Sequence, residues 1–94
     1  LFTGFRDKGS LFENYVYNRI KKYHPCYYVV DAYEIDFLLE KTVLIEAKYN
    51  AELKGKQLDL FSDADFKHKF LVTSHEELNT LLTTLSSIFN RLSG

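Results

Sequence analysis

Residues 34 to 49 read EIDFLLEKTVLIEAKY, a mostly apolar segment in which acidic side chains also occur. Two stretches rich in apolar side chains flank a short polar break around Glu40 and Lys41. A period of two is typical of a β-strand with one face buried, and a short break between two such stretches is typical of a hairpin. The segment therefore predicts two antiparallel strands, residues 34 to 39 and 42 to 49, joined by a tight loop.

The residues before this hairpin predict a helix and one more strand. Residues 10 to 13, SLFE, have the S-x-x-E form of a capping box, and a helical stripe of apolar side chains continues over residues 10 to 23. Pro25 ends this helix, because the residue before a proline avoids the helical conformation. The aromatic and β-branched run at residues 27 to 32 then predicts a strand.

The C-terminal half predicts two helices and a short strand between them. A weaker helical pattern covers residues 51 to 61, and the apolar run at residues 70 to 72 predicts a buried strand. A second S-x-x-E sequence, at residues 74 to 77, precedes an amphipathic stripe that reaches Leu92. The order α-β-β-β-α-β-α indicates a single α/β domain, with a mixed sheet and helices on both of its faces.

Charged side chains share one face of the predicted hairpin. If Phe37 faces Ile45, the same register places Asp36 opposite Glu46. Directly opposed residues have Cβ atoms about 4.5 to 5.5 Å apart, so two like charges there destabilise the pair. Lys48 is on the same face but roughly 6.5 to 7 Å further along the strand, too far to neutralise both acids closely.

A hard divalent cation between the two carboxylates resolves this conflict. Mg²⁺ typically takes one or two carboxylates together with water and substrate phosphate. Such an ion would lower the pKa of a bound water and polarise a phosphodiester. The Lys48 ammonium would orient or deprotonate the water and offset negative charge in the transition state. The residue types therefore match metal-assisted phosphodiester hydrolysis.

Each charged residue also has a structural explanation of its own. Glu46 and Lys48 fit a weak surface ion pair, and Asp36 fits a charge that protects an edge strand from aggregation. Glu13 fits the last position of a capping box. These explanations require three unrelated reasons for acids in one apolar β region.

Composition narrows the classes of function. The net charge of the 94 residues is −1, so nucleic-acid binding would depend on local patches. Three lysine clusters are candidates, but each alone is better explained as a solvated face or helix end: Lys21-Lys22, Lys54-Gly55-Lys56 and Lys67-His68-Lys69.

The number of cysteines and the hydropathy of the chain indicate the compartment in which the protein works. Cys26 is the single cysteine, which fits a reducing, cytoplasmic compartment, and its place at the entry to an apolar strand predicts a buried, inert thiol. No apolar run approaches the roughly 18 residues of a membrane span, and no signal-peptide pattern occurs, so we expect no membrane partner. Because Met is absent even at position 1, we expect a domain of a longer protein.

The acids, the lysine and the element order together resemble the PD-(D/E)XK nuclease superfamily. The resemblance rests on Asp36, nine intervening residues and then Glu46-Ala47-Lys48, and the element order covers nearly the whole chain. It implies a restriction-endonuclease-like core. GSLFENYVYNRI (9 to 20), EIDFLLE (34 to 40) and LIEAKY (44 to 49) look more specifically like the C-terminal domain of a group of archaeal and bacterial AAA-type ATPases, a domain largely of unknown function.

The resemblance assigns roles by position. Asp36 and Glu46 would bind the metal directly, and Glu13 in the first helix would help to bind it, often through water. Lys48 would position the attacking water. Gln57 would be a polar residue on the following helix that faces the site.

The chain departs from the pattern in two respects. Ile35 stands where the superfamily's pattern has a proline before the aspartate. No GxxxxGK[ST] motif occurs, so the ATPase portion is absent from this chain.

Two functions follow as expectations. The first is a Mg²⁺- or Mn²⁺-dependent endonuclease-like domain that hydrolyses DNA phosphodiester bonds and is joined to an N-terminal ATPase domain. A homodimer would suit cleavage of two strands. The second is an inactive module of nuclease fold that serves oligomerisation or the binding of DNA or a partner. The near-neutral charge and the many tyrosines favour it. The sequence does not distinguish DNA from RNA as substrate.

Overall fold

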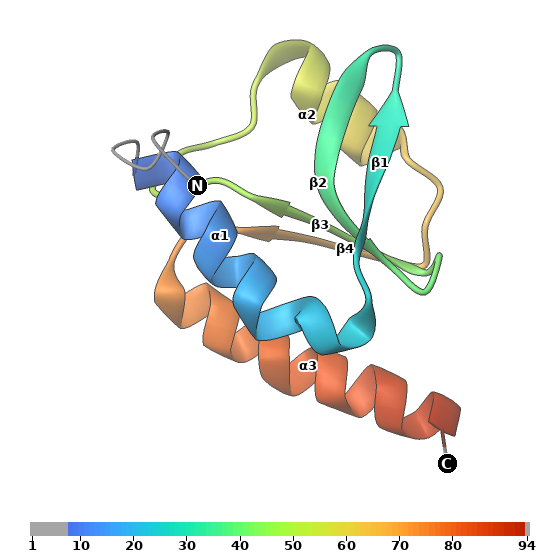
Figure 1. The fold of residues 1–94 in the computed structure, drawn as a ribbon. Coiled ribbons are helices and arrows are strands. Elements are labelled where there is room, and N and C mark those ends of the chain that lie inside the picture. Colours follow the sequence, from blue (N-terminus) through green and yellow to red (C-terminus); the bar gives the residue numbers. More distant parts are fainter. Residues whose placement is uncertain (1–7, 94) are drawn as a thin grey trace.

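The structure of the chain, a computed structural model, describes residues 8–93, apart from the side chains of Lys8, Ser10 and residues 91–93. Within these residues it is an α/β domain with three α-helices, a short 3-10 helix and a four-stranded sheet (Figure 1). The elements in chain order are α1 (Lys8–Ile20), η2 (Lys21–Tyr23), β1 (Cys26–Val30), β2 (Tyr33–Leu39), β3 (Val43–Ala47), α2 (Gly55–Asp63), β4 (His68–Val72) and α3 (His75–Ser93).

The sheet is mixed, as the sequence predicts. Its strand order is β1-β2-β3-β4, in which the β1–β2 and β2–β3 pairs are antiparallel and the β3–β4 pair is parallel. The connection between β3 and β4 contains α2. Figure 1 shows α1 and α3 on one face of the sheet and α2 on the other, which confirms helices on both faces.

The β2–β3 hairpin has the predicted register, with Phe37 paired with Ile45. Its turn is made by Glu40 and Lys41, whose φ angles are 51° and 61°. Two successive residues with positive φ give the turn a twist that matches the right-handed twist of the flanking strands. The hairpin therefore forms without glycine at either position.

The main core lies between the sheet and the α1–α3 layer. It is built from one face of β2, β3 and β4 and from the apolar stripes of the two helices: Phe12, Val16, Ile20, Phe37, Leu39, Val43, Ile45, Ala47, Val72, Leu78, Leu81 and Leu85. Leu92, the last residue of the predicted stripe, lies outside the residues whose side chains are described. No described helix combines the length and the apolar character that a membrane span needs.

The first predicted helix start is wrong. α1 already includes Lys8 and Gly9, so Ser10 lies inside the helix rather than before it. Glycine is a weak helix former, so the pattern places the boundary after it. The predicted end is close to the observed one: α1 passes into η2, and His24 adopts φ 56° just before Pro25.

The boundaries around β1, β3, α2 and β4 also differ from the predicted ones. β1 and β3 stop at Val30 and Ala47, two residues earlier than predicted. The helix predicted over residues 51 to 61 begins at Gly55, and the buried Leu53 before it supplies the apolar spacing that resembles a first helical turn. β4 starts at His68, whose N–H donates to the Thr42 carbonyl at 3.2 Å and so extends the strand beyond its apolar run.

The second capping box is confirmed at the start of α3, with one change of partner. The Glu77 N–H donates to Ser74 Oγ at 3.1 Å. Glu77 Oε1 in turn accepts a 2.7 Å hydrogen bond from the N–H of Thr73 rather than of Ser74. The same bond pattern lowers the pKa of Glu77, because Thr73 donates to its ionised form.

Candidate functional site

Asp36 and Glu46 meet across the β2–β3 pair, as the predicted register requires. The Asp36 N–H donates to Glu46 Oε1 at 3.2 Å, and the Ala47 N–H donates to Asp36 Oδ2 at 2.8 Å. Each carboxylate is therefore held by the backbone of the opposite strand. Both side chains lie on the face of the hairpin away from the Phe37 and Ile45 core face.

A β-bulge lies at the position of Asp36. The β1–β2 pairing shifts register, so that Asp36 and Phe37 of β2 together oppose Tyr27 of β1. A bulge leaves one residue unpaired, bends its strand and can re-aim a side chain, and bulges are frequent beside active sites. Sequence periodicity does not reveal this extra residue, because it changes the pairing with β1 and leaves the pairing with β3 intact.

Burial sets the electrostatics of the acid pair. Glu46 is only 3% exposed, and Asp36 is half-buried. Loss of solvent, followed by the negative charge of Asp36, raises the pKa of Glu46 to about 8. Burial also raises the pKa of Asp36, although the Ala47 N–H opposes that shift. In the absence of a cation, the pair therefore retains a proton near neutral pH.

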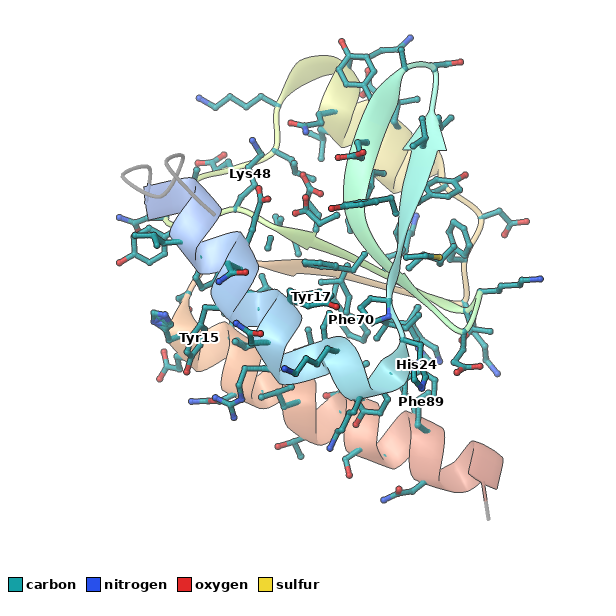
Figure 2. All side chains as sticks on the ribbon, in the orientation of Figure 1. Tyr15, Tyr17, His24, Lys48, Phe70 and Phe89 are labelled. Atoms are coloured by element: carbon teal, nitrogen blue, oxygen red, sulfur yellow. The ribbon has the colours of Figure 1, made fainter. Side chains whose placement is uncertain are left out.

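Gln57 and Lys48 approach the acid pair from different elements. Gln57 lies on α2, and its Nε2 is 3.5 Å from Glu46 Oε2, so α2 faces the acids as the sequence predicts. Lys48, which is labelled in Figure 2, is half-buried where β3 ends. Its backbone N–H donates to the Val72 carbonyl at 2.9 Å. Its positive charge acts to lower the pKa of both Asp36 and Glu46.

Glu13 shares a cleft with Asp36. The cleft has a volume of about 550 Å³ and lies between α1, which contributes Glu13, Asn14 and Tyr17, and the β1–β2 pair, which contributes Tyr27 and Asp36. Within the described residues, no group of three or more His, Cys, Asp or Glu side chains is placed to hold a metal ion together. Glu13 therefore faces the same space as Asp36 without forming a three-carboxylate cluster with the pair.

The prediction of a buried thiol at Cys26 is wrong. Cys26 is exposed at the start of β1, it lines the same cleft, and its Sγ lies 3.7 Å from the Leu38 carbonyl. β1 is an edge strand of the sheet, and its first two side chains are exposed. An apolar run in the sequence does not show whether its strand lies at the edge or in the centre of a sheet.

Two tyrosines of the cleft are absent from the sequence-based prediction. Tyr17 is 43% exposed on α1, and its ring centroid lies 6.3 Å from that of Phe37 (Figure 2). Tyr27 is 68% exposed on β1, opposite the bulge. The spacing of four residues between Glu13 and Tyr17 places them on one helix face and is the signal that connects Tyr17 to the site.

Lys69 is used within the fold. Its Nζ donates to the carbonyls of Phe61 at 3.2 Å and Ser62 at 2.5 Å, in the last turn of α2. A lysine there satisfies carbonyls at a helix C-terminus and complements the helix dipole. The structural interpretation of this lysine cluster is therefore correct for Lys69.

One protein family matches most of the chain. Its sequence model, a domain of unknown function (DUF4143), covers residues 8–88. The matched region contains both acids, Lys48, Gln57 and Glu13, as well as the cleft. No curated protein and no solved structure matches the chain. The chain belongs to the DUF4143 family of domains of unknown function.

Proposed function

We propose that this domain is a divalent-metal-dependent nuclease-like domain that hydrolyses DNA phosphodiester bonds. The observation that carries the proposal is the Asp36–Glu46 pair, in which a buried and a half-buried carboxylate are fixed beside each other by backbone N–H bonds of 3.2 Å and 2.8 Å. Burying two like charges in contact is costly unless a cation or a proton compensates them. A bound cation would compensate the electrostatic penalty of holding these two carboxylates together, and we infer that the site binds one.

The donors present suit Mg²⁺ or Mn²⁺. Asp36 and Glu46 provide carboxylate oxygens, and ions of this class bind through one or two carboxylates and leave other positions to water and phosphate. Among the residues that the structure describes, no third His, Cys, Asp or Glu joins the pair as a metal-binding group, whereas Zn²⁺ sites need three or four protein ligands. When bound, the ion would supply Lewis acidity to the phosphodiester and a more acidic water.

The surrounding residues support this chemistry. Lys48 follows Glu46 by two residues on the same face of the extended chain, so its ammonium is available to orient a nucleophilic water and to offset charge on the phosphate. Gln57 contacts Glu46 and would hold that carboxylate in position. Glu13, across the cleft from Asp36, would act through water.

The wider context of the proposal follows from the resemblance to the PD-(D/E)XK superfamily. The observed element order, in which α1 precedes a three-stranded meander and α2 leads to a parallel fourth strand, supports a restriction-endonuclease-like core. We extend the proposal to a domain joined to an AAA-type ATPase in a longer protein, with DNA as the substrate.

A second candidate function is an inactive module that binds a partner. It is favoured by a separate patch at the start of α1 and α3, where the rings of Tyr15 and His75 lie 4.7 Å apart and Tyr49 and Leu11 are exposed. An exposed cluster of aromatic and apolar side chains is typical of interaction surfaces. This candidate requires neither metal binding nor cleavage.

Metal binding and DNA cleavage together distinguish the nuclease-like domain from the inactive module. We would measure thermal unfolding of the wild type, Asp36→Asn and Asp59→Asn with and without Mg²⁺ or Mn²⁺, and then the nicking of plasmid DNA. Asp59 is an exposed acid on α2, and so it is a matched control. A ligand at 100 times its Kd stabilises a protein by about 2.7 kcal/mol, or roughly 10–20 °C for a domain of this size.

The nuclease proposal expects a metal-induced rise in Tm and nicking in the wild type and in Asp59→Asn, and neither in Asp36→Asn. Equal responses of the two variants to metal would contradict the site. Metal binding at Asp36 without nicking of any DNA substrate would favour the inactive module.

A further inference from the structure

The cleft beside Asp36 has the chemistry of a base-binding site. Its walls carry two exposed tyrosines, Tyr17 from α1 and Tyr27 from β1, and the amide side chain of the exposed Asn14. Aromatic faces stack on any nucleobase, and a side-chain amide can hydrogen-bond to a base edge. The volume of about 550 Å³ lies within the range of small-molecule sites.

The charges of the cleft argue against a channel for the phosphate backbone. Its charged lining residues are Glu13 and Asp36, and neither lysine nor arginine is among the described residues that line it. Proteins hold phosphates with Lys, Arg and backbone N–H groups. A phosphodiester chain would therefore pass outside the cleft, at the acid pair and Lys48, while a neutral and flat group enters it.

The position of the cleft connects it to the acid pair. Asp36 both lines the cleft and contacts Glu46 through its backbone N–H. The bulge sets Tyr27 directly opposite Asp36 and Phe37. A base stacked on Tyr27 would thus belong to a nucleotide next to the phosphodiester at the acids. A base inside a duplex is stacked on both of its faces and paired along one edge, so it does not reach such a cleft without being extruded.

We propose that this cleft binds one unpaired nucleobase beside the scissile phosphate, so that the domain prefers single-stranded DNA or an unpaired segment to continuous duplex. The inference rests on the proposed nuclease function for the position of the phosphate. The binding of a base in the cleft is measurable without cleavage.

Cys26 provides a built-in probe of this cleft. It is the single cysteine of the chain, it is exposed and it lines the cleft. We would measure its rate of alkylation by N-ethylmaleimide in Mg²⁺, alone and with a phosphorothioate-linked oligothymidylate, whose sulfur substitution slows hydrolysis. A phosphorothioate duplex of the same length is the second arm. The single strand is expected to slow alkylation at least about fivefold, and the duplex to leave it unchanged.

Tyr27→Ala tests the stacking, with Tyr33→Ala as its control. Tyr33 is also exposed, at 40%, but it does not line the cleft. Loss of one stacked base should weaken single-strand binding by roughly 5- to 150-fold in Tyr27→Ala and leave Tyr33→Ala near the wild type. Because Tyr27 is largely exposed, its truncation should leave the fold intact, which far-UV circular dichroism checks.

The outcomes separate this inference from the proposed function. If the single strand protects Cys26 and Tyr27→Ala abolishes this protection, the base site is supported. If the same protein cuts no strand, only the nuclease proposal is refuted. Equal protection by single strand and duplex, or equal binding by the two tyrosine variants, overturns the base site even in an enzyme that nicks DNA.

Discussion

The backbone N–H of Asp36 donates to Glu46 Oε1, so the two acids are tied together through the main chain of one and the side chain of the other. The return bond runs from the Ala47 N–H to Asp36 Oδ2. Because the backbone fixes both carboxylates, they cannot move apart to reduce their repulsion while these bonds persist. A proton or a cation must therefore compensate it.

Stability should fall as pH rises when no metal is present. The pKa of Glu46 is about 8 in the folded chain and 4.5 in its ordinary state, so the folded state binds the proton more tightly. At low pH, where Glu46 is protonated in both states, there is no penalty. The penalty grows as pH rises from about 4.5, by roughly 1.4 kcal/mol per pH unit, and is complete above about 8 at up to about 5 kcal/mol. Urea unfolding in EDTA from about pH 5 to about pH 9 measures it.

Glu46→Gln should flatten this profile, because the amide stays neutral and Gln57 can rotate its own amide to remain a partner. Glu52→Gln, at an exposed position, should keep the wild-type profile and serves as the control. A wild-type stability that rises over the same pH range would refute the strained acid pair.

Lys48 should affect cleavage more than metal binding. Lys48→Ala is expected to reduce nicking by about 10²- to 10⁴-fold, the usual contribution of a positioned acid or base. The rise in Tm caused by Mg²⁺ should persist, because Asp36 and Glu46 remain. Lys54→Ala removes an exposed lysine before α2 and should leave both measurements unchanged. Loss of the metal-induced Tm shift in Lys48→Ala would show that Lys48 serves the metal site or the fold instead.

Thr42→Val should stabilise the hairpin that carries the acids. Thr42 Oγ1 is buried, and among the described residues it has no hydrogen-bond partner. A buried hydroxyl without a partner costs about 1–3 kcal/mol, and valine has nearly the same shape. The backbone bonds of residue 42, from its N–H to the Leu39 carbonyl and from the His68 N–H to its own carbonyl, do not involve the hydroxyl.

We expect a gain of about 1 kcal/mol, or roughly 4–8 °C in Tm, by thermal and urea unfolding. Thr42→Ser keeps the hydroxyl and loses the methyl group, so it should be less stable than the wild type. A destabilised Thr42→Val would mean that the hydroxyl has a partner such as an ordered water.

Periodicity alone predicts the meeting of Asp36 and Glu46. A period of two leaves few registers that bury both apolar faces, and a one-residue slip would turn a strand over. Residue 57 lies within both the predicted and the observed helix, although the predicted start of that helix is wrong, and its side chain faces Glu46. The α/β class and the mixed sheet follow from the order of elements in the same way.

Features that depend on neighbours distant in sequence escape prediction. The exposure of Cys26 depends on β1 lying at an edge of the sheet, which the strand's own residues do not specify. The bulge opposite Tyr27 depends on how β1 pairs with β2. The cleft requires α1 to pack at one position over the sheet, so its two tyrosines appear together only in the folded chain. The late helix start predicted at Ser10 has a local cause, since S-x-x-E also occurs within helices.

The central place of β3 in the sheet has a consequence for local unfolding of the domain. All five of its residues are buried, and it pairs with β2 on one side and β4 on the other. Amide protons of such central strands usually exchange with solvent only through global unfolding. Glu46 therefore belongs to the last segment of the domain to open. Ligand exchange at the acid pair would therefore depend on movements of the elements around β3 and not on the opening of β3 itself.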